Sequence, residues 1–228
     1  MPAASLTREE LLDRLYDTFS RYGYEGASMA LIAASTGLGK ASLYHHFPGG
    51  KREMAAAIVD HLRAWYETAV FRPLEGVNPP RQRLAAMLEA IGKRFESGNR
   101  ACLPALFALT EERALFGEAI RDLFVRMIAC LTQTLCDAGL ARDIAHRRAC
   151  ECAVRIHGGL AMVRALDDPR IFATVAAELP DQLLAGADRS ALWTARGTPR
   201  FPAPPPVSAL RAIESAATAA PSPAPVSG

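Results

Sequence analysis

GLGKASLYHHFPGGK, residues 37–51, is the stretch that decides the expected fold. Glycines, which interrupt helices, lie at both ends of it, and the segment between them, Lys40–His46, has the length of a short helix. Another short helix is expected just before it, over Met29–Thr36, with Ser28 as its N-cap and Gly37 as its stop. Two short helices joined by a tight glycine turn make a helix-turn-helix unit.

The side chains of the Lys40–His46 helix divide into two groups. Leu43 and Phe47 lie four residues apart, so they share a face that can pack on the first helix. The other side chains offer positive charge and hydrogen bonds, which suit DNA phosphates and base edges in a major groove. The residues expected to contact DNA are Ser28, Met29, Gly39, Lys40, Ala41, Ser42, Tyr44, His45, His46 and Lys51.

The local charge also favours a nucleic-acid partner. No Asp or Glu occurs between Glu25 and Glu53, although the whole chain has a formal net charge of only +2. Lys51 and Arg52 begin a further helix, where two cations and the backbone N-terminus could together hold one phosphate. A positive surface on a nearly neutral chain is therefore expected at this place.

The rest of the chain is expected to be helical as well. Thr7 and Glu10 form a capping box at the start of a first helix, which ends near Gly23. Residues 71–78 are expected to form a linker, and Asn78 before a proline favours the start of the next helix. The later helices are expected over about 80–97, 103–110, 112–138 and 142–166, with a last one beginning at Asp168-Pro169.

Two segments of the sequence resemble a known family. The order G-x-x-K-x-x-L-Y-H-H-F, after a short alanine-rich helix, resembles the recognition-helix signature of TetR/AcrR-type transcriptional regulators. GYEGASMALIAASTG, residues 23–37, resembles the segment that precedes this signature in the family. The resemblance covers about Leu6 to Arg63, so it spans the helix-turn-helix unit and its neighbouring helices.

Three departures from the family pattern concern the DNA-reading residues. The family often has Ser where Gly39 stands, so the recognition helix here lacks a hydroxyl cap. It often has Gly at the position of Ala41, and charged residues in the second helix where Ala30 and Leu31 stand. These differences leave the operator sequence open.

The helical pattern and the resemblance together predict an all-α fold in two parts. The first is an N-terminal three-helix helix-turn-helix DNA-binding domain, expected over residues 1–50 and followed by a connecting helix and linker over 51–75. The second is a C-terminal helical bundle for ligand binding and dimerisation, expected over 76–186. The segment 187–228 is rich in proline and alanine, which predicts a largely disordered tail.

The resemblance implies a one-component transcriptional regulator, expected to act as a repressor. Such a protein binds a palindromic operator as a homodimer and is released by a small-molecule ligand. The implied partners are double-stranded DNA, an apolar or amphipathic effector, and a second copy of the chain. No cofactor, metal ion or catalytic residue is expected, and the chain is not expected to be an enzyme.

An effector pocket should have apolar walls and a few polar groups. The candidates on helices expected to surround it are Phe95, Phe107, Phe124, Met127 and His157. The alternative, that all five are ordinary core residues, is equally open. The dimer face is expected on the last two long helices, where Gly158, Gly159 and Ala161 would let two backbones approach closely.

Other kinds of function have weaker support in the sequence. The adjacent His45 and His46 point about 100° apart on a helix and cannot chelate one ion together. FPGGK lacks the pattern of a Walker loop, so a nucleotide site is not expected there. His146 and Cys150 are spaced i, i+4, which leaves a thiol or metal sensor as an alternative hypothesis. A helical enzyme using the C-terminal Cys and His residues is a further alternative, although no catalytic spacing supports it.

Composition and targeting signals indicate where the protein works. The five cysteines are an odd number and do not resemble a disulfide framework, which favours a reducing cytoplasm. The sequence shows no signal-peptide pattern and no apolar run of about 18 residues, so neither secretion nor a membrane span is expected.

Overall fold

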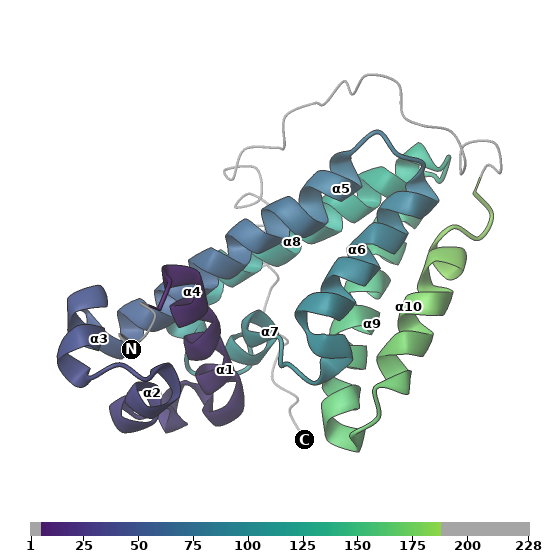
Figure 1. Cartoon of the computed structure of the whole chain (residues 1–228). Helices are drawn as coiled ribbons and strands as arrows, with labels where there is room; N and C mark the ends of the chain where they lie inside the picture. Colours follow the sequence, from purple (N-terminus) through teal and green to yellow (C-terminus); the bar gives the residue numbers. More distant parts are fainter. Residues whose placement is uncertain (1–5, 188–228) are drawn as a thin grey trace, which may run out of the picture. The chain divides into compact units, whose positions relative to one another are not determined.

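The computed structural model describes residues 6–187, and every regular element in that range is a helix (Figure 1). The expected all-α class is therefore confirmed. The chain divides into two units, Met1–Arg196 and Gly197–Gly228, and the described residues belong to the first. The expected proline-rich tail lies outside the described residues from position 188 onward. Within the described range, no helix combines the length and the hydrophobicity that crossing a membrane requires.

Helix α1 (Arg8–Gly26) begins with the expected capping box. The backbone N–H of Thr7 donates to Oε2 of Glu10 at 2.8 Å, and the N–H of Glu10 donates to Oγ1 of Thr7 at 3.2 Å. Gly23 has a φ of +69°, which glycine adopts without strain, and it interrupts the helical geometry near the predicted end. Local signals therefore set both limits of the regular part of α1.

Helices α2 (Met29–Thr36) and α3 (Lys40–His46) have the predicted bounds. Oγ of Ser28 accepts a backbone N–H from the first turn of α2 at 3.2 Å, and Gly37 ends that helix with a left-handed φ of +72°. No side chain caps α3, because its N-cap residue is Gly39. The helix-turn-helix geometry expected from these caps and stops is confirmed.

A buried apolar core joins α1, α2 and α3 to α4 (Gly50–Tyr66). Leu43 and Phe47, the predicted packing face of α3, are both fully buried in this core. Met54, Ile58 and Leu62 of α4 are buried too. At the end of that helix Tyr66 is fully enclosed, while its neighbour Trp65 is half-buried. The core therefore fixes the rotation of α3 about its own axis.

The helical path continues beyond α4, where the sequence predicts a linker over 71–78, and that prediction is wrong for residues 71–75. A π-helix, η1 (Glu67–Phe71), leads into α5 (Arg72–Glu75). Proline is tolerated in the first turn of a helix, and Pro73 lies there in α5. Leu74 is buried, so tertiary packing stabilises a segment whose proline favours a break.

The C-terminal helices of the described range pack as a bundle. Helix α8 runs along α9, and α10 lies against both α9 and α6 (Figure 1). Helix α9 has the predicted bounds, and α8 buries an apolar stripe that includes Phe116, Ile120 and Leu123. The bounds are α6 (Pro80–Arg94), the 3-10 helix η2 (Glu96–Gly98), α7 (Leu103–Phe107), α8 (Arg113–Asp137), α9 (Arg142–Leu166) and α10 (Arg170–Leu183).

The helix predicted over 80–97 begins where it was expected, at Pro80, but its predicted cap and its predicted end need correction. Pro79, not Asn78, is the N-cap of α6, because a residue that precedes a proline avoids helical backbone angles and Pro79 precedes Pro80. At the other end, Glu96 and Ser97 adopt positive φ values of 49° and 53°, which ends the α-helix early. The predicted helix over 103–110 is also too long, since α7 ends at residue 107.

A buried ion pair fastens α5, α6 and α8 together. Nη1 of Arg83 lies 2.9 Å from Oδ2 of Asp137 and donates to the carbonyl oxygen of Leu74 at 2.8 Å. Oγ1 of Thr134 donates to the same carbonyl at 3.1 Å. Burial lowers the pKa of Arg83 to about 10, so its guanidinium remains charged at neutral pH. Three elements distant in sequence therefore depend on one buried charge.

Candidate nucleic-acid interface

Helix α3 presents its polar side chains on the side opposite the core. Lys40, Tyr44, His45 and His46 are exposed, and Ser42 is half-buried. Because Leu43 and Phe47 point inward, the exposed side chains cannot rotate away without unpacking the core. Of the ten residues predicted to contact DNA, none is buried; those that are half-buried are Met29, Ser42 and Lys51.

Hydrogen bonds from α1 hold the turn between α2 and α3. Nη1 of Arg14 donates to the carbonyl oxygen of Thr36 at 3.0 Å, at the C-terminal end of α2. Oγ1 of Thr18 donates to Oγ of Ser35 at 2.6 Å. Exposed carbonyls at a helix end need such partners. The two bonds therefore orient the turn that positions α3.

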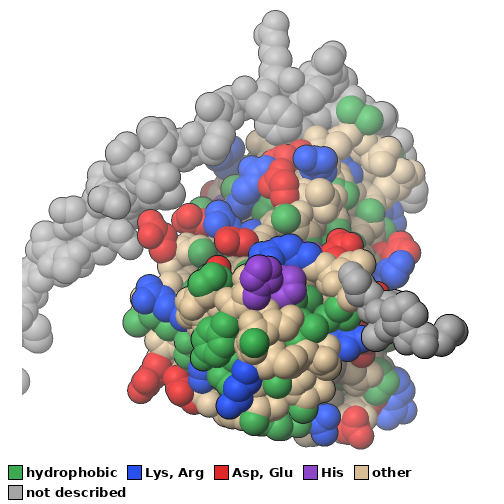
Figure 2. Space-filling view, turned by 60° about the vertical axis from the view of Figure 1, so that its left-hand side comes forward, with side chains coloured by type: hydrophobic (Ala, Val, Ile, Leu, Met, Phe, Trp, Pro, Cys, Tyr) green, Lys and Arg blue, Asp and Glu red, His purple; other side chains and the backbone are tan. Residues whose placement is uncertain are grey.

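Figure 2 turns the end of the protein that carries α2 and α3 toward the reader. Histidine side chains lie near the middle of this face, and most of the acidic side chains in the view lie toward its edges. The rings of His45 and His46 are 5.8 Å apart at an interplanar angle of 69°. Within residues 6–187, no three His, Cys, Asp or Glu side chains are arranged to hold a metal ion.

The structure places Lys51 among partners that the sequence does not reveal. Its Nζ lies 4.5 Å from the ring centroid of Tyr24 and 3.8 Å from Oε2 of Glu25. The N–H of Gly49, at the head of α4, donates to Oε2 of Glu53 at 2.6 Å. A phosphate at the start of α4 would therefore compete with two carboxylates, and phosphate binding by Lys51 stays a prediction.

The five candidate pocket residues do not form one continuous wall. A ring contact joins Phe124 to His157, with centroids 4.9 Å apart and an interplanar angle of 85°. Phe107 instead stacks on Phe116 at 5.6 Å, and Phe95 packs against Trp65. Ordinary core packing accounts for Phe95, Phe107 and Met127, which are buried. Their role in ligand binding stays a prediction.

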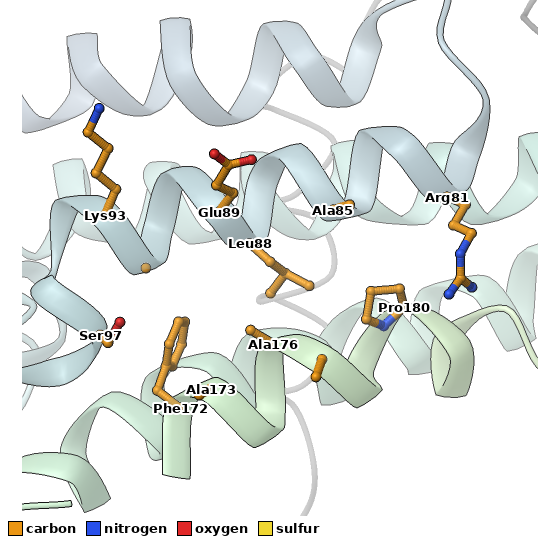
Figure 3. Close-up of a pocket in the computed structure, with 12 residues that line it drawn as sticks. Arg81, Ala85, Leu88, Glu89, Lys93, Ser97, Phe172, Ala173, Ala176 and Pro180 are labelled. Carbon is orange, nitrogen blue, oxygen red and sulfur yellow. The ribbon is translucent and has the colours of Figure 1, made fainter. Parts of the chain in front are cut away.

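A cavity of 610 Å³ lies between α6 and α10, and none of the five candidates lines it (Figure 3). Leu88, Phe172, Ala176 and Pro180 project between the two helices, with Ser97 at one end and Arg81 at the other. Arg81, one of the lining residues, forms an ion pair with Asp181 of α10. The sequence gives one signal for this cavity, which is the presence of small alanine side chains along both α6 and α10. It does not show that the alanine-rich faces of the two helices lie opposite each other.

His157 is the polar member of the candidate set with an unusual environment. Both ring nitrogens are buried without a hydrogen-bond partner in the described part of the chain. Burial disfavours the charged imidazolium and lowers the pKa of His157 from 6.5 to about 4. The folded protein therefore takes up this proton only at a more acidic pH than the unfolded chain.

We expect stability to fall as the pH drops from about 6.5 toward 4, because over this interval the unfolded chain binds a proton that folded His157 does not. One such proton changes the free energy of unfolding by up to about 1.4 kcal/mol per pH unit. Urea denaturation at a series of pH values measures this slope. His157→Gln should flatten it, and His146→Gln, at an exposed position on the same helix, should not. Equal slopes in all three proteins would assign the effect to other groups.

The cysteines offer little support for the thiol or metal alternative. All five are free, and burial raises the pKa of Cys102 to about 11 and of Cys152 to about 12. Burial, with the nearby Glu75 carboxylate, raises the pKa of Cys130 to about 12. High thiol pKa values make these side chains poor nucleophiles. Sγ of Cys150 lies 3.8 Å from Nε2 of His146, but this pair has no third ligand in the described residues.

Comparison with known proteins agrees with this geometry. A family model described as "Bacterial regulatory proteins, tetR family" matches residues 11–58, which run from α1 into α4. The HTH-type transcriptional regulator LmrA of Bacillus subtilis (strain 168) is 27% identical over 116 residues. That alignment covers 51% of this chain and 62% of LmrA, so it spans less than two thirds of that relative.

Solved structures match most of the chain. A TetR transcriptional regulator from Legionella pneumophila is similar with a TM-score of 0.67 and 20% identity, over 80% of this chain and 99% of that one. The TetR family regulator CifR, solved as a cysteine mutant complexed with 26-bp double-strand operator DNA, has a TM-score of 0.60 and 26% identity. That match covers 81% of this chain and 98% of the CifR chain. Sequence signature, helix-turn-helix geometry and whole-fold similarity agree: residues 11–58 match the tetR family of bacterial regulatory proteins, and the chain as a whole has the fold of TetR-family regulators.

Proposed function

We propose that this protein is a one-component, ligand-responsive transcriptional regulator that inserts α3 into the major groove of its operator. The observation that supports this proposal most directly is that α3 has one apolar side and one polar side. Its apolar side is locked in the core, while its polar side is exposed in a segment without acidic residues. Direct readout in a major groove needs a rigid helix with exposed hydrogen-bonding side chains. The similar CifR protein has been solved with operator DNA, which supports the same role here.

We further propose that the protein represses transcription as a homodimer in the cytoplasm. A dimer would use α9, where Val154 is 72% exposed and where Gly158, Ala161 and Met162 follow on the exposed surface. A Cβ atom built on Gly158 meets nothing within 4 Å, so this position is open to a second backbone. Two-fold symmetry would place two copies of α3 on the half-sites of a palindrome.

The expected contribution of Gly159 to the dimer face does not fit its surroundings. A Cβ built on Gly159 would lie 3.5 Å from Val175 and 3.6 Å from Phe172, both on α10. Gly159 therefore serves the packing of α9 on α10 within one chain. The dimer face that we propose is limited to the outer side of α9, from Val154 to Met162.

Contacts between α1 and residues 94–103 provide a route by which an effector could act on the reading helix. Oδ1 of Asp13 lies 2.9 Å from Nη1 of Arg94 and 3.0 Å from Nη2 of Arg100. The hydroxyl of Tyr16 donates to the carbonyl oxygen of Ala101. An effector releases DNA only if it binds the DNA-incompetent arrangement more tightly than the competent one. We expect the contacts between α1 and residues 94–103 to differ between the DNA-competent and the DNA-incompetent arrangement.

We expect the full-length protein to bind its own upstream DNA with an affinity that falls steeply with salt, because cationic side chains displace counterions from phosphates. Lys51→Ala should weaken binding to all sequences about equally and should reduce the salt slope by roughly one unit. Fluorescence anisotropy of labelled promoter DNA over a range of salt concentrations measures both quantities. Lys93→Ala, an exposed lysine on α6, is the matched control and should change neither. A folded protein that binds no promoter DNA even at low salt would contradict the proposed function.

A further inference from the structure

The surface that α3 offers to DNA lacks most of the side chains that usually read bases. Guanine is read mainly by Arg or Lys, adenine by Asn or Gln, and cytosine by Asp or Glu. Between Glu25 and Lys51 the sequence contains no Arg, Asn, Gln, Asp or Glu, so of these side chains only Lys40 is present. The reading surface therefore has almost no means of making paired hydrogen bonds to a base edge.

The burial of Leu43 decides which side chains of α3 point farthest from the core. Successive residues of an α-helix are turned by about 100°, so Ala41 and His45 lie about 160° from Leu43 around the helix axis. By the same rule, Lys40 lies only about 60° from Leu43. Leu43 is fully buried, whereas Ala41, His45 and Lys40 are exposed. The middle of the outward side of α3 therefore consists of a methyl group and an imidazole.

Tyr44 adds an apolar wall beside Ala41. The two residues are three apart on α3, so they share a side of the helix. Tyr44 is 48% exposed, and its ring lies at the head of α4, since a Cβ built on Gly50 would lie 3.5 Å from Cε1 of Tyr44. Leu31 on α2 is 37% exposed as well, and hydrophobic side chains lie beside the histidines on the face that Figure 2 shows. This face is therefore apolar as well as positive.

The remaining polar side chains of α3 have limited power to distinguish bases. A neutral imidazole has one donor and one acceptor on different ring atoms, so His45 cannot make two parallel hydrogen bonds to one base edge. Ser42 is half-buried, and its hydroxyl can bond to any base. One base, however, carries an apolar group in the major groove, which is the C5 methyl group of thymine. An exposed alanine with an aromatic ring beside it is complementary to that methyl group.

We propose that Ala41, with the ring of Tyr44 beside it, recognises the C5 methyl group of a thymine in each operator half-site. This inference rests on the proposed function, because it requires α3 to lie in the major groove. The base pair that faces Ala41 is then a thymine paired with adenine. Its identity is read by apolar contact rather than by paired hydrogen bonds.

The test begins with a random double-stranded DNA library, from which the full-length protein selects its preferred half-site. Deoxyuridine then replaces each thymine of that half-site in turn, which removes the C5 methyl group and keeps every hydrogen-bonding atom of the base. Fluorescence anisotropy with competing DNA measures the affinity for each duplex. We expect one thymine position at which the replacement weakens binding by about fourfold in each half-site, as the loss of one buried methyl group predicts. At the other positions the replacement should have almost no effect.

Ala41→Gly links the effect to this residue. The change removes the methyl group on the protein side, so the variant should bind the thymine duplex and the deoxyuridine duplex with nearly equal affinity. Ala86→Gly makes the same change at an exposed position on α6 and should keep the full discrimination. Glycine weakens a helix by a similar amount at both positions, and thermal melting shows that each variant is folded.

The possible outcomes separate this inference from the proposed function. A selected half-site without thymine, or equal binding of thymine and deoxyuridine at every position, would overturn the inference and leave sequence-specific DNA binding intact. A loss that persists unchanged in Ala41→Gly would also overturn it, and would assign the preference for thymine to DNA shape or to another side chain. A folded protein that selects no sequence and binds no DNA would overturn the proposed function together with the inference.

Discussion

Asp137→Asn is expected to lower the free energy of unfolding by about 3–5 kcal/mol, because it breaks a buried ion pair and leaves one charge behind. That charge belongs to Arg83, whose side chain is 1% exposed and lies 2.9 Å from Asp137. Without the carboxylate, the buried guanidinium keeps only neutral acceptors, such as the Leu74 carbonyl. Urea denaturation followed by circular dichroism measures the loss.

A second variant separates the value of the ion pair from the cost of breaking it. Replacing both partners, with Arg83→Met and Asp137→Leu, removes the buried charges together and should recover much of the lost stability. Asp122→Asn, an exposed aspartate on the same helix, serves as the control and should change stability by less than about 0.5 kcal/mol. A loss below about 1 kcal/mol in Asp137→Asn would show that water or another group compensates Arg83.

Leu43→Ala should destabilise the protein by about 2–5 kcal/mol, since it removes a fully buried leucine from the core beneath α3. Tyr44→Ala, one residue further along the helix, should have little effect on stability, because Tyr44 is 48% exposed. It should instead weaken operator binding relative to random DNA by about 1–3 kcal/mol if its contact reaches a base edge. Ser42→Ala is expected to behave in the same way at a half-buried position.

The pattern across these variants is more informative than any single value. Thermal melting gives the stability of each, and competition between operator and random DNA gives the discrimination. If Tyr44→Ala melts the domain while Leu43→Ala leaves it intact, α3 is rotated from the orientation in which Leu43 faces the core. Equal losses on operator and random DNA for Tyr44→Ala would instead assign that side chain to a phosphate.

The N-terminal helices illustrate what can be predicted from sequence. The capping box at Thr7, the cap at Ser28 and the stop at Gly37 act within one turn of the residues that create them. The bounds of α2 and α3, and the inward orientation of Leu43 and Phe47, therefore follow from spacing alone. Such interactions are as visible in the sequence as in the fold.

Interactions between distant segments are visible only in three dimensions. The sequence predicts a break after residue 70, yet burial of Leu74 and the carbonyl contact from Arg83 maintain a helix through Pro73. The candidate residues for an effector pocket share a suitable chemistry, but the fold distributes them among separate packing contacts.

By itself, the sequence determined the helical class, the helix-turn-helix unit and the face of α3 that is free to meet DNA. These depend on caps, glycines and periodicity, which act over a few residues. Only the tertiary structure decided that Lys51 lies on Tyr24 beside Glu25 and that Gly159 faces α10. Each of these facts depends on which helices meet and at what angle. The packing of the whole core sets those angles, and no short stretch of residues encodes them.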